Sequence, residues 1–395
     1  MARPRLVLAA PVRTPIGKFG GALAALSAAD LGAAAAQAAL ARAGLAGEAI
    51  DQVVFGHARQ AGGGPNTARQ IAHRSGVPDD RPAFTVNQAC GSGLQAILCG
   101  ARAILLGEAE VVLAGGTESM SNTPYLLPRA RWGYRLGHDE IVDGMHRDGF
   151  DDPLSGLVMG ETAEELGAES GVGRDEADAY AAETQRRCEA ARKSGRFAAE
   201  IAPLTVPGRR GEVTVAADEH PRDGVDVAAL AKLAPVFRAG GSVTAGNASG
   251  ITDGAAAMVV VSQAAAERLG LAPAGYLVDW EVVGVEPRIM GIGPVPATRR
   301  LLARQGLDFE AIETVELNEA FATQVLACLR ELPFDRARVN PDGGAIALGH
   351  PIGATGARIL TTLLHGMAAR GERRGVATLC VSGGLGLAAL VERPA

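Results

Sequence analysis

The segment from residue 84 to residue 107, FTVNQACGSGLQAILCGARAILLG, reads as a short strand, a tight turn and a helix in immediate succession. Its first three residues, Phe84-Thr85-Val86, have the β-branched and aromatic composition of a strand. The run from Gly93 to Leu106 is typical of a buried helix, and Gly107 predicts its end. Cys90 lies in the turn, where unpaired backbone N–H groups and the positive end of the helix dipole favour a thiolate. Cys90 is therefore a candidate nucleophile, the alternative being a buried structural cysteine at a glycine-rich turn.

Outside this segment, short β-branched runs alternate with alanine-rich helical stretches, which indicates an α/β fold. A clear helix is predicted near the N-terminus, where Ser27 and Asp30 form a capping pair and Gly44 ends the run.

Two short patterns occur twice in the chain. Glu48-Ala49-Ile50 with Val53 recurs as Glu310-Ala311-Ile312 with Val315, and Gly107-Glu108 before a β-branched run recurs at Gly371-Glu372. Repeats at a similar separation predict two similar α/β halves, each with one buried sheet.

The segment between these halves is rich in proline and mixed charge, and its clearest helix is predicted from Arg174 to Lys193. Loop-rich material over a rigid scaffold is a common place for ligand contacts. We therefore divide the chain into an N-terminal half (1–120 and 242–270), an inserted loop domain (121–241) and a C-terminal half (271–395).

Composition narrows the function classes. The 395 residues suffice for two or three domains, and 47% hydrophobic with 21% charged residues is typical of a globular protein. A net charge of −6 argues against nucleic acid as a partner. No unbroken apolar run reaches the roughly 18–20 residues of a membrane span. The N-terminal apolar run is too short for a secretory signal. We expect a cytoplasmic protein without a membrane partner.

The five cysteines are odd in number and lack the spacing of metal ligands. Two of them lie near glycine-rich turns, Cys90 and Cys380, and Cys380 ends a predicted strand before Ser382-Gly383-Gly384. The Cys380 turn can line a site with backbone N–H groups or merely join two packed strands. No metal site is predicted.

Two further polar residues follow predicted strands or precede predicted helices. His350 lies between glycines and before Pro351, a setting that core filling explains poorly, so it is a candidate base or oxyanion donor. Asn318 follows a strand and opens a helix, where a local role as helix cap accounts for it.

Taken together, these segments resemble the thiolase family over almost the whole chain. Eight motifs carry the resemblance in the same order as in that family, and their combination is far more specific than any one of them: Val12–Pro15, Asn66–Gln70, Asn87–Gly93, Ala114–Ser121, Val243–Gly250, Met290–Pro294, Asn318–Phe321 and the glycine-rich loop of His350.

The resemblance implies a layered α/β/α/β/α fold of two duplicated halves, with an inserted domain that binds coenzyme A. It also implies roles. Cys90 takes the acyl group as a thioester, His350 accepts its proton, and Cys380 moves the proton at the substrate α-carbon. Asn318 holds a water that stabilises the enolate together with His350. The backbone N–H groups of Cys90 and Ser382 form a second oxyanion hole.

For the substrate, the resemblance implies that Ser249 lies against the pantetheine and Arg222 near the nucleotide, with Met159 and the residue before it lining the acyl pocket. No metal or redox cofactor is implied, because coenzyme A is itself the acyl carrier. Acetyl-CoA, 3-oxoacyl-CoA and CoA are the expected partners, and at least a dimer, more specifically a tetramer, is the expected assembly.

The chain departs from the family pattern at two positions. Val158 stands where short-chain members have histidine before Met-Gly, which bears on acetoacetyl specificity. Ser382 stands where the usual turn has glycine, and its Cβ restricts the backbone beside the sulfur.

The function implied is acyl-CoA C-acyltransfer by reversible Claisen condensation, specifically that of an acetyl-CoA acetyltransferase. Alternatives are a degradative 3-oxoacyl-CoA thiolase of longer or branched chains, a decarboxylating condensing enzyme, an inactive acyl-CoA-binding scaffold, and a cysteine hydrolase built on Cys90, His350 and Asn318. A second cysteine at Cys380 favours the thiolase over the other condensing enzymes, which generally use one.

Overall fold

The structure, a computed structural model, describes residues 4–208 and 211–394. Its strands form a long mixed sheet in the order β12-β13-β14-β11-β1-β10-β5-β3-β4. β1 pairs antiparallel with both β10 and β11, so one edge joins the strands of the two halves. The sequence predicted one buried sheet for each half, and the structure adds that the two are hydrogen-bonded together along this edge.

The main elements follow the same order in the two halves, namely strand, helix, strand, helix, helix, strand and strand, and each half adds further short elements of its own. The first half consists of β1 (Leu6–Arg13), β2 (Gly17–Lys18), α1 (Ala28–Ala43), β3 (Gln52–Gly56), α2 (Thr67–Arg74), β4 (Ala83–Val86), α3 (Ser92–Leu106), β5 (Val111–Ser119), β10 (Thr252–Ser262) and α7 (Gln263–Leu269). The second half consists of β11 (Pro273–Gly284), α8 (Pro294–Gln305), β12 (Thr314–Leu317), α9 (Ala322–Glu331), α10 (Ala345–Leu348), α11 (Ile352–Arg370), β13 (Arg374–Val381) and β14 (Leu385–Glu392).

The repeated sequence patterns fall at matching places in these halves. The first pattern precedes β3 in one half and β12 in the other, and the second joins α3 to β5 and α11 to β13. β3 runs parallel to β4 and β5, and β12 runs parallel to β13. The structure therefore agrees with the predicted duplication, and it makes α3 and α11 counterparts of each other.

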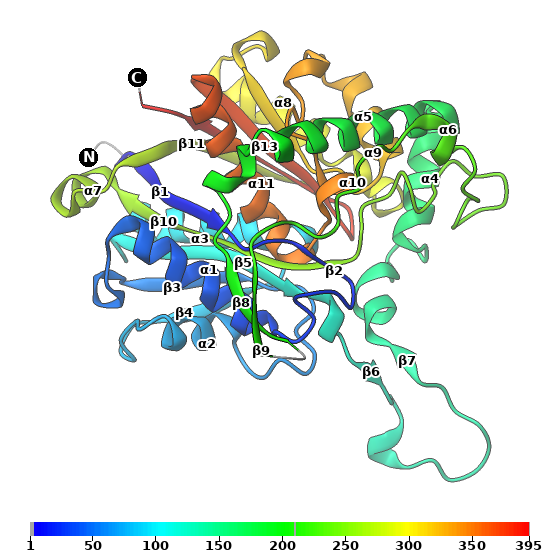
Figure 1. The fold of residues 1–395 in the computed structure, drawn as a ribbon, viewed down its shortest axis with the longest axis horizontal. Helices are drawn as coiled ribbons and strands as arrows, with labels where there is room; N and C mark the ends of the chain where they lie inside the picture. Colours follow the sequence, from blue (N-terminus) through cyan, green and yellow to red (C-terminus); the bar gives the residue numbers. More distant parts are fainter. Residues whose placement is uncertain (1–3, 209–210, 395) are drawn as a thin grey trace.

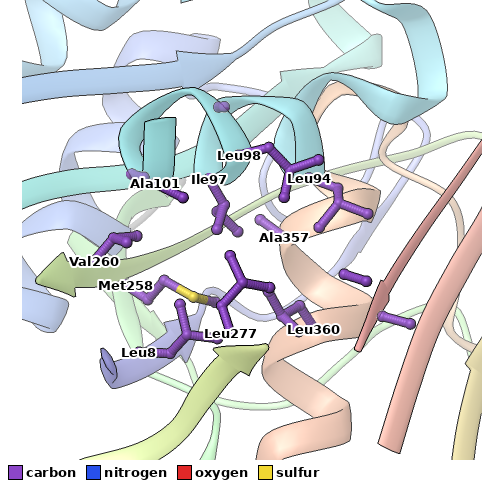
Figure 2. Close-up of a cluster of buried hydrophobic side chains, with 14 of the residues drawn as sticks. Leu8, Leu94, Ile97, Leu98, Ala101, Met258, Val260, Leu277, Ala357 and Leu360 are labelled. Carbon is purple, nitrogen blue, oxygen red and sulfur yellow. The ribbon is translucent and has the colours of Figure 1, made fainter. Parts of the chain in front are cut away.

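The hydrophobic core is divided into layers by the sheet. One cluster contains residues of both α3 and α11 between strands of the two halves (Figure 2), including Leu94, Ile97, Ala357, Leu360 and Met258. A second cluster packs α1 and α2 against the first half, and a third packs α8 and α9 against the second half. Helix, sheet, helix, sheet and helix thus succeed one another, which confirms the predicted layering.

Local signals of the sequence match the helix bounds. Ser27 accepts a hydrogen bond from the backbone N–H of Asp30 in the predicted capping box, and Gly44 ends α1 in the left-handed region. The segment Ala89–Leu106 has the length and hydropathy of a membrane span, and Ser92, Gln95 and Arg102 interrupt its apolar run. It lies in the central layer as α3, and a buried core helix has the same composition.

The inserted segment follows β5 and returns to the chain at β10. It contains β6 (Tyr125–Leu126), β7 (Val142–Asp143), α4 (Met159–Ser170), α5 (Arg174–Lys193), β8 (Leu204–Gly208), β9 (Gly211–Val215) and α6 (Val227–Leu230). The part that carries β6 and β7 projects away from the layered body (Figure 1). The predicted helix from Arg174 to Lys193 is present with those bounds.

Candidate active site

Cys90 lies in a strained turn between β4 and α3. The preceding residue, Ala89, has a φ of 43°, a left-handed conformation that a residue with a Cβ rarely adopts. Two side chains hold this turn: Asn87 Oδ1 accepts from the Ala89 N–H at 3.0 Å, and Ser92 Oγ accepts from the Gln88 N–H at 2.9 Å. Strain that is held in this way at a nucleophile resembles the elbow of other α/β enzymes.

A pocket of about 440 Å³ opens beside this turn. Its lining comes from both halves and from the inserted segment, and it brings together these residues that were singled out from the sequence: Cys90, Val158, Met159, Arg222, Ser249, His350, Cys380 and Ser382. The turn after β4 supplies Cys90 to this lining, and the end of β13 with its following turn supplies Cys380 and Ser382.

The charge state of Cys90 differs from the expectation. The positive charge of Arg59, and after it the backbone N–H groups of Ser382 and Cys90, act to lower the pKa of the thiol. Burial acts in the opposite direction and is the largest influence, so the pKa of Cys90 is raised above its ordinary value. The free protein therefore holds Cys90 mainly as a thiol near neutral pH. The expectation of a thiolate considered the helix end but not the desolvation of the sulfur.

His350 precedes α11 as Cys90 precedes α3. Its Nδ1 lies 2.6 Å from the hydroxyl of Thr355, and that hydroxyl donates to the Pro351 carbonyl at 3.0 Å. The hydroxyl proton is thereby used, so Nδ1 of His350 is the donor and Nε2 carries the lone pair. Burial, with the positive charges of Arg358 and Arg59, lowers the pKa of His350 to about 3. A neutral imidazole with a free Nε2 can accept a proton.

Cys380 is the last residue but one of β13 and is fully buried. Burial raises the pKa of its thiol well above the ordinary value, and the neighbouring Cys90 and Cys328 act in the same direction. The next turn presents Ser382 to the pocket that Cys90 also lines. Two cysteines thus lie in one site, one at a turn rich in N–H donors and one in an apolar wall.

Asn318 corrects one sequence interpretation. It follows β12, but α9 begins only at Ala322 and its cap residue is Phe321, so Asn318 is not a helix cap. Its Oδ1 and Nδ2 are both buried and have no hydrogen-bond partner within residues 4–208 and 211–394. A buried amide costs free energy when it is unpaired, so this side chain fits a role in which it binds a small polar ligand. It is not among the residues that line the pocket.

The residues assigned to coenzyme A lie at several sides of the pocket. Ser249 follows the Val243–Asn247 loop, and its N–H donates to the Ala320 carbonyl at 2.9 Å. Val158 is the cap residue of α4 and Met159 is the first residue of that helix. Apolar side chains supply much of the remaining lining: Met120, Phe150, Val236, Phe237, Ile251, Met290, Phe321 and Ile352.

Three residues near the site were not found from the sequence. Glu118 lies inside a quoted motif without a role, yet it is fully buried and accepts from the N–H groups of Arg59 and Gly353 at 3.1 and 2.9 Å, which ties the first half to the loop after His350. Thr355 orients His350. Arg59 lines the pocket. The available signals were a carboxylate inside a buried apolar strand for Glu118 and a cation three residues after such a strand for Arg59.

The comparisons with known proteins agree with this geometry. A family model described as "Thiolase, N-terminal domain" matches residues 6–264, and "Thiolase, C-terminal domain" matches residues 271–393. The chain belongs to the thiolase family.

Relatives of this thiolase carry matching names. An acetyl-CoA acetyltransferase of Pseudomonas aeruginosa is 50% identical over 98% of this chain and 99% of its own length. An acetyl-CoA acetyltransferase of Escherichia coli is 48% identical over 98% of both chains.

Solved structures of the family superpose closely on this thiolase. The acetyl-CoA acetyltransferase of Bacillus anthracis has a TM-score of 0.97 at 44% identity and 99% coverage of both chains. The human mitochondrial 3-ketoacyl-CoA thiolase has a TM-score of 0.96 at 41% identity, again with 99% coverage of both chains. A structure of that human enzyme contains CoA. Proteins with this fold thus include both acetyl-CoA acetyltransferases and 3-ketoacyl-CoA thiolases.

Proposed function

We propose that this thiolase transfers acetyl groups between coenzyme A thioesters, cleaving acetoacetyl-CoA with CoA and forming it in reverse. The observation that carries the proposal is the convergence of Cys90, His350, Cys380 and the Ser382 N–H on one pocket. Relatives at 46–50% identity over nearly the whole chain are named acetyl-CoA acetyltransferase, which supports the acetyl specificity.

In the cleavage direction, Cys90 passes its proton to Nε2 of His350 and its sulfur attacks the 3-oxo carbon. The bond between the α-carbon and that carbon breaks, and the electron pair forms the enolate of acetyl-CoA. The enolate takes the proton of the Cys380 thiol, for which the raised pKa of that thiol keeps the proton available. The N–H groups of Cys90 and Ser382 stabilise the oxyanion on the acyl carbon.

The second half regenerates the enzyme. The proton on His350 returns to Cys380, which restores both residues. The thiol of CoA then gives its proton to His350 and attacks the thioester, and Cys90 leaves as a thiolate and recovers that proton. Asn318 holds a water that, with His350, stabilises the enolate oxygen, a role that suits its two unpaired polar atoms. The residues require no metal or redox cofactor for any of these steps.

A second candidate is cleavage of longer 3-oxoacyl chains. The observation that favours it is the apolar wall at Val158, together with Phe150, Met120 and Ile352. An apolar lining stabilises each additional buried methylene by about 0.8 kcal/mol.

Thiolysis of a chain-length series of 3-oxoacyl-CoAs with free CoA separates the two candidates, with Cys90→Ala as the control. A rate that peaks at acetoacetyl-CoA supports the acetyltransferase, and a peak at longer chains supports the degradative thiolase. The Cys90→Ala variant should lose turnover by at least about 10³-fold in both directions, because the acyl acceptor is gone. Near-wild-type turnover in this variant would contradict the assignment of the nucleophile.

We also propose that the inserted segment serves coenzyme A binding and assembly in a cytoplasmic oligomer. Arg222 lies within this segment and Ser249 follows it, and both residues line the pocket. The projecting part around β6 and β7 carries large apolar side chains on its surface, which is typical of an interaction surface.

A further inference from the structure

Arg59 is a buried cation that the reaction scheme above does not use. It follows β3, its side chain lines the pocket, and only 6% of the residue is exposed. The guanidinium carbon lies 5.6 Å from the centre of the Phe150 ring. Phe150 and Cys90 both pack against one apolar cluster, which consists of Ala58, Met120, Met145 and Ile352. Arg59 therefore lies at the Cys90 end of the pocket.

Its backbone is tied to the turn that carries the nucleophile. The Asn87 Nδ2 group donates to the Ala58 carbonyl at 3.1 Å, and the His57 N–H donates to the Val86 carbonyl at 3.0 Å. Asn87 also holds the strained Ala89 conformation beside Cys90. The segment with Arg59 and the turn with Cys90 thus form one hydrogen-bonded unit.

Within the described residues, the guanidinium of Arg59 makes no salt bridge. Its Nη1 donates to the Asp148 carbonyl at 3.2 Å, while Nε and Nη2 are without a hydrogen-bond partner in the described parts of the chain. The buried carboxylate of Glu118 already accepts from four other groups, namely the ring of His57 and the N–H groups of Ala58, Arg59 and Gly353. No aspartate or glutamate is among the residues that line the pocket.

The buried carboxylate of Glu118 interacts with Arg59 through its charge but accepts no hydrogen bond from the guanidinium, so the cation can also act on Cys90, which lines the same pocket. We propose that Arg59 acts as a positioning residue that stabilises the thiolate of Cys90 electrostatically. In this scheme Arg59 supplies the positive charge, and His350 remains neutral and accepts the proton.

The electrostatics of the surrounding groups are consistent with this role. Among the influences that lower the pKa of Cys90, Arg59 is the largest, while burial and the negative charge of Glu118 raise it. Burial, with Arg358 and Arg59, lowers the pKa of His350, so its imidazolium is not the cation that acts on Cys90. Cys380 is a thiol in the resting site because burial raises its pKa. Arg59 is thus the cation that acts on Cys90 in the shared pocket.

The test measures the pH dependence of Cys90 alkylation by iodoacetamide in the absence of CoA, followed by mass spectrometry of the Cys90 peptide. Loss of the charge in Arg59→Met should move the midpoint upward by about one pH unit, the lower end of the effect of a nearby opposite charge. Arg59→Lys should keep the wild-type midpoint. Arg222→Met, which removes the other arginine of the pocket, should leave the midpoint in place.

Arg59→Gln provides a second neutral variant that keeps a donor for the Asp148 carbonyl, and it should show the same upward shift if Arg59→Met does not fold. An unchanged midpoint in a folded neutral variant would overturn the proposal. An equal shift in Arg59→Lys or in Arg222→Met would overturn it too, because the effect would then come from packing or from overall charge. The inference rests on Cys90 as the nucleophile of the proposed function. Alkylation needs no turnover, so loss of acetyltransfer specificity would leave this test intact.

Discussion

At the scale of single residues, the protonation state of His350 is set by its neighbours. Thr355 accepts from Nδ1, and burial with two arginines holds the pKa of the ring at about 3. The ring therefore stays neutral from about pH 5 to about pH 8, where an ordinary histidine would titrate. We expect kcat/KM to show no step from His350 in this range and to rise with pH as Cys90 ionises. A fall in kcat/KM with decreasing pH, centred near the ordinary histidine pKa, would contradict this prediction if the pH profile of Cys90 alkylation showed no such fall.

The Thr355 hydroxyl carries a second prediction at this scale. In Thr355→Val the buried Nδ1–H loses its acceptor, which costs about 1–3 kcal/mol, so kcat should fall by about 10- to 100-fold. Thr355→Ser keeps the hydroxyl and should restore most of the rate. Steady-state thiolysis of acetoacetyl-CoA measures both, and equal loss in the two variants would indicate that packing, not the hydrogen bond, matters at this position.

Cys380 and Cys90 should be separable by a labelling experiment. Cys380→Ser removes the acid and base for the α-carbon but leaves the Cys90 turn and its N–H donors in place. Turnover should fall sharply, whereas radiolabelled acetyl-CoA should still mark the protein at Cys90. A Cys380→Ser protein that takes no label would show that the two roles are not separate, and Cys90→Ala supplies the unlabelled control.

At the scale of elements, the site depends on how closely α3 and α11 approach. A Cβ on Gly93 would lie 2.8 Å from the Ala357 nitrogen and 3.0 Å from the Gly353 carbonyl oxygen, so glycine is required at this crossing. The crossing brings the start of α3, with Cys90, close to the start of α11, with His350. The proximity of Cys90 and His350 is therefore a property of two packed helices.

Gly93→Ala should separate these helices. We expect a loss of about 1–3 kcal/mol in the free energy of unfolding, as for other overpacked sites, and a lower kcat because Cys90 moves relative to His350. Urea unfolding and thiolysis rates measure the two effects. Gly173→Ala is the matched control, since a Cβ there meets no atom within 4 Å. Full activity in a destabilised Gly93→Ala protein would contradict the prediction, because it would show that the packing of α3 on α11 does not set the position of Cys90 relative to His350.

At the scale of the whole molecule, the projecting segment around β6 and β7 has an unusually apolar surface. It exposes Trp132 at 82% and Leu136 at 99%, with Tyr125 and Ile141 also largely exposed. Side chains of this kind are rarely left in water by a monomer. We expect a second copy of the chain to cover them.

The double variant Trp132→Ser, Leu136→Ser should therefore have a smaller assembly than the wild type in light scattering, at the same protein concentration. Its circular dichroism should be unchanged, because these side chains pack on nothing in the described parts of their own chain. Leu106→Ser, an exposed leucine on the layered body, is the control and should keep the wild-type mass. An unchanged mass for the double variant would remove this segment from the interface.

The sequence by itself determined the local elements and the family. Caps such as Ser27 and Gly44, the run before Gly107 and the paired patterns at 48–53 and 310–315 act over a few residues, so their consequences are local and readable. The motifs around Cys90, His350 and Cys380 identified the chemistry for the same reason, because each presents its side chain from a short glycine-rich turn.

Only the tertiary structure decided how those turns act on one another. Burial outweighs the helix end at Cys90. Asn318 has no hydrogen-bond partner in the described residues and does not cap a helix, and Arg59 and Cys90 line one pocket although they lie in separate turns. Desolvation, unpaired donors and the distance between charges depend on atoms brought together from distant parts of the chain. A local run of residues does not determine these quantities, so they can be obtained only from the folded protein.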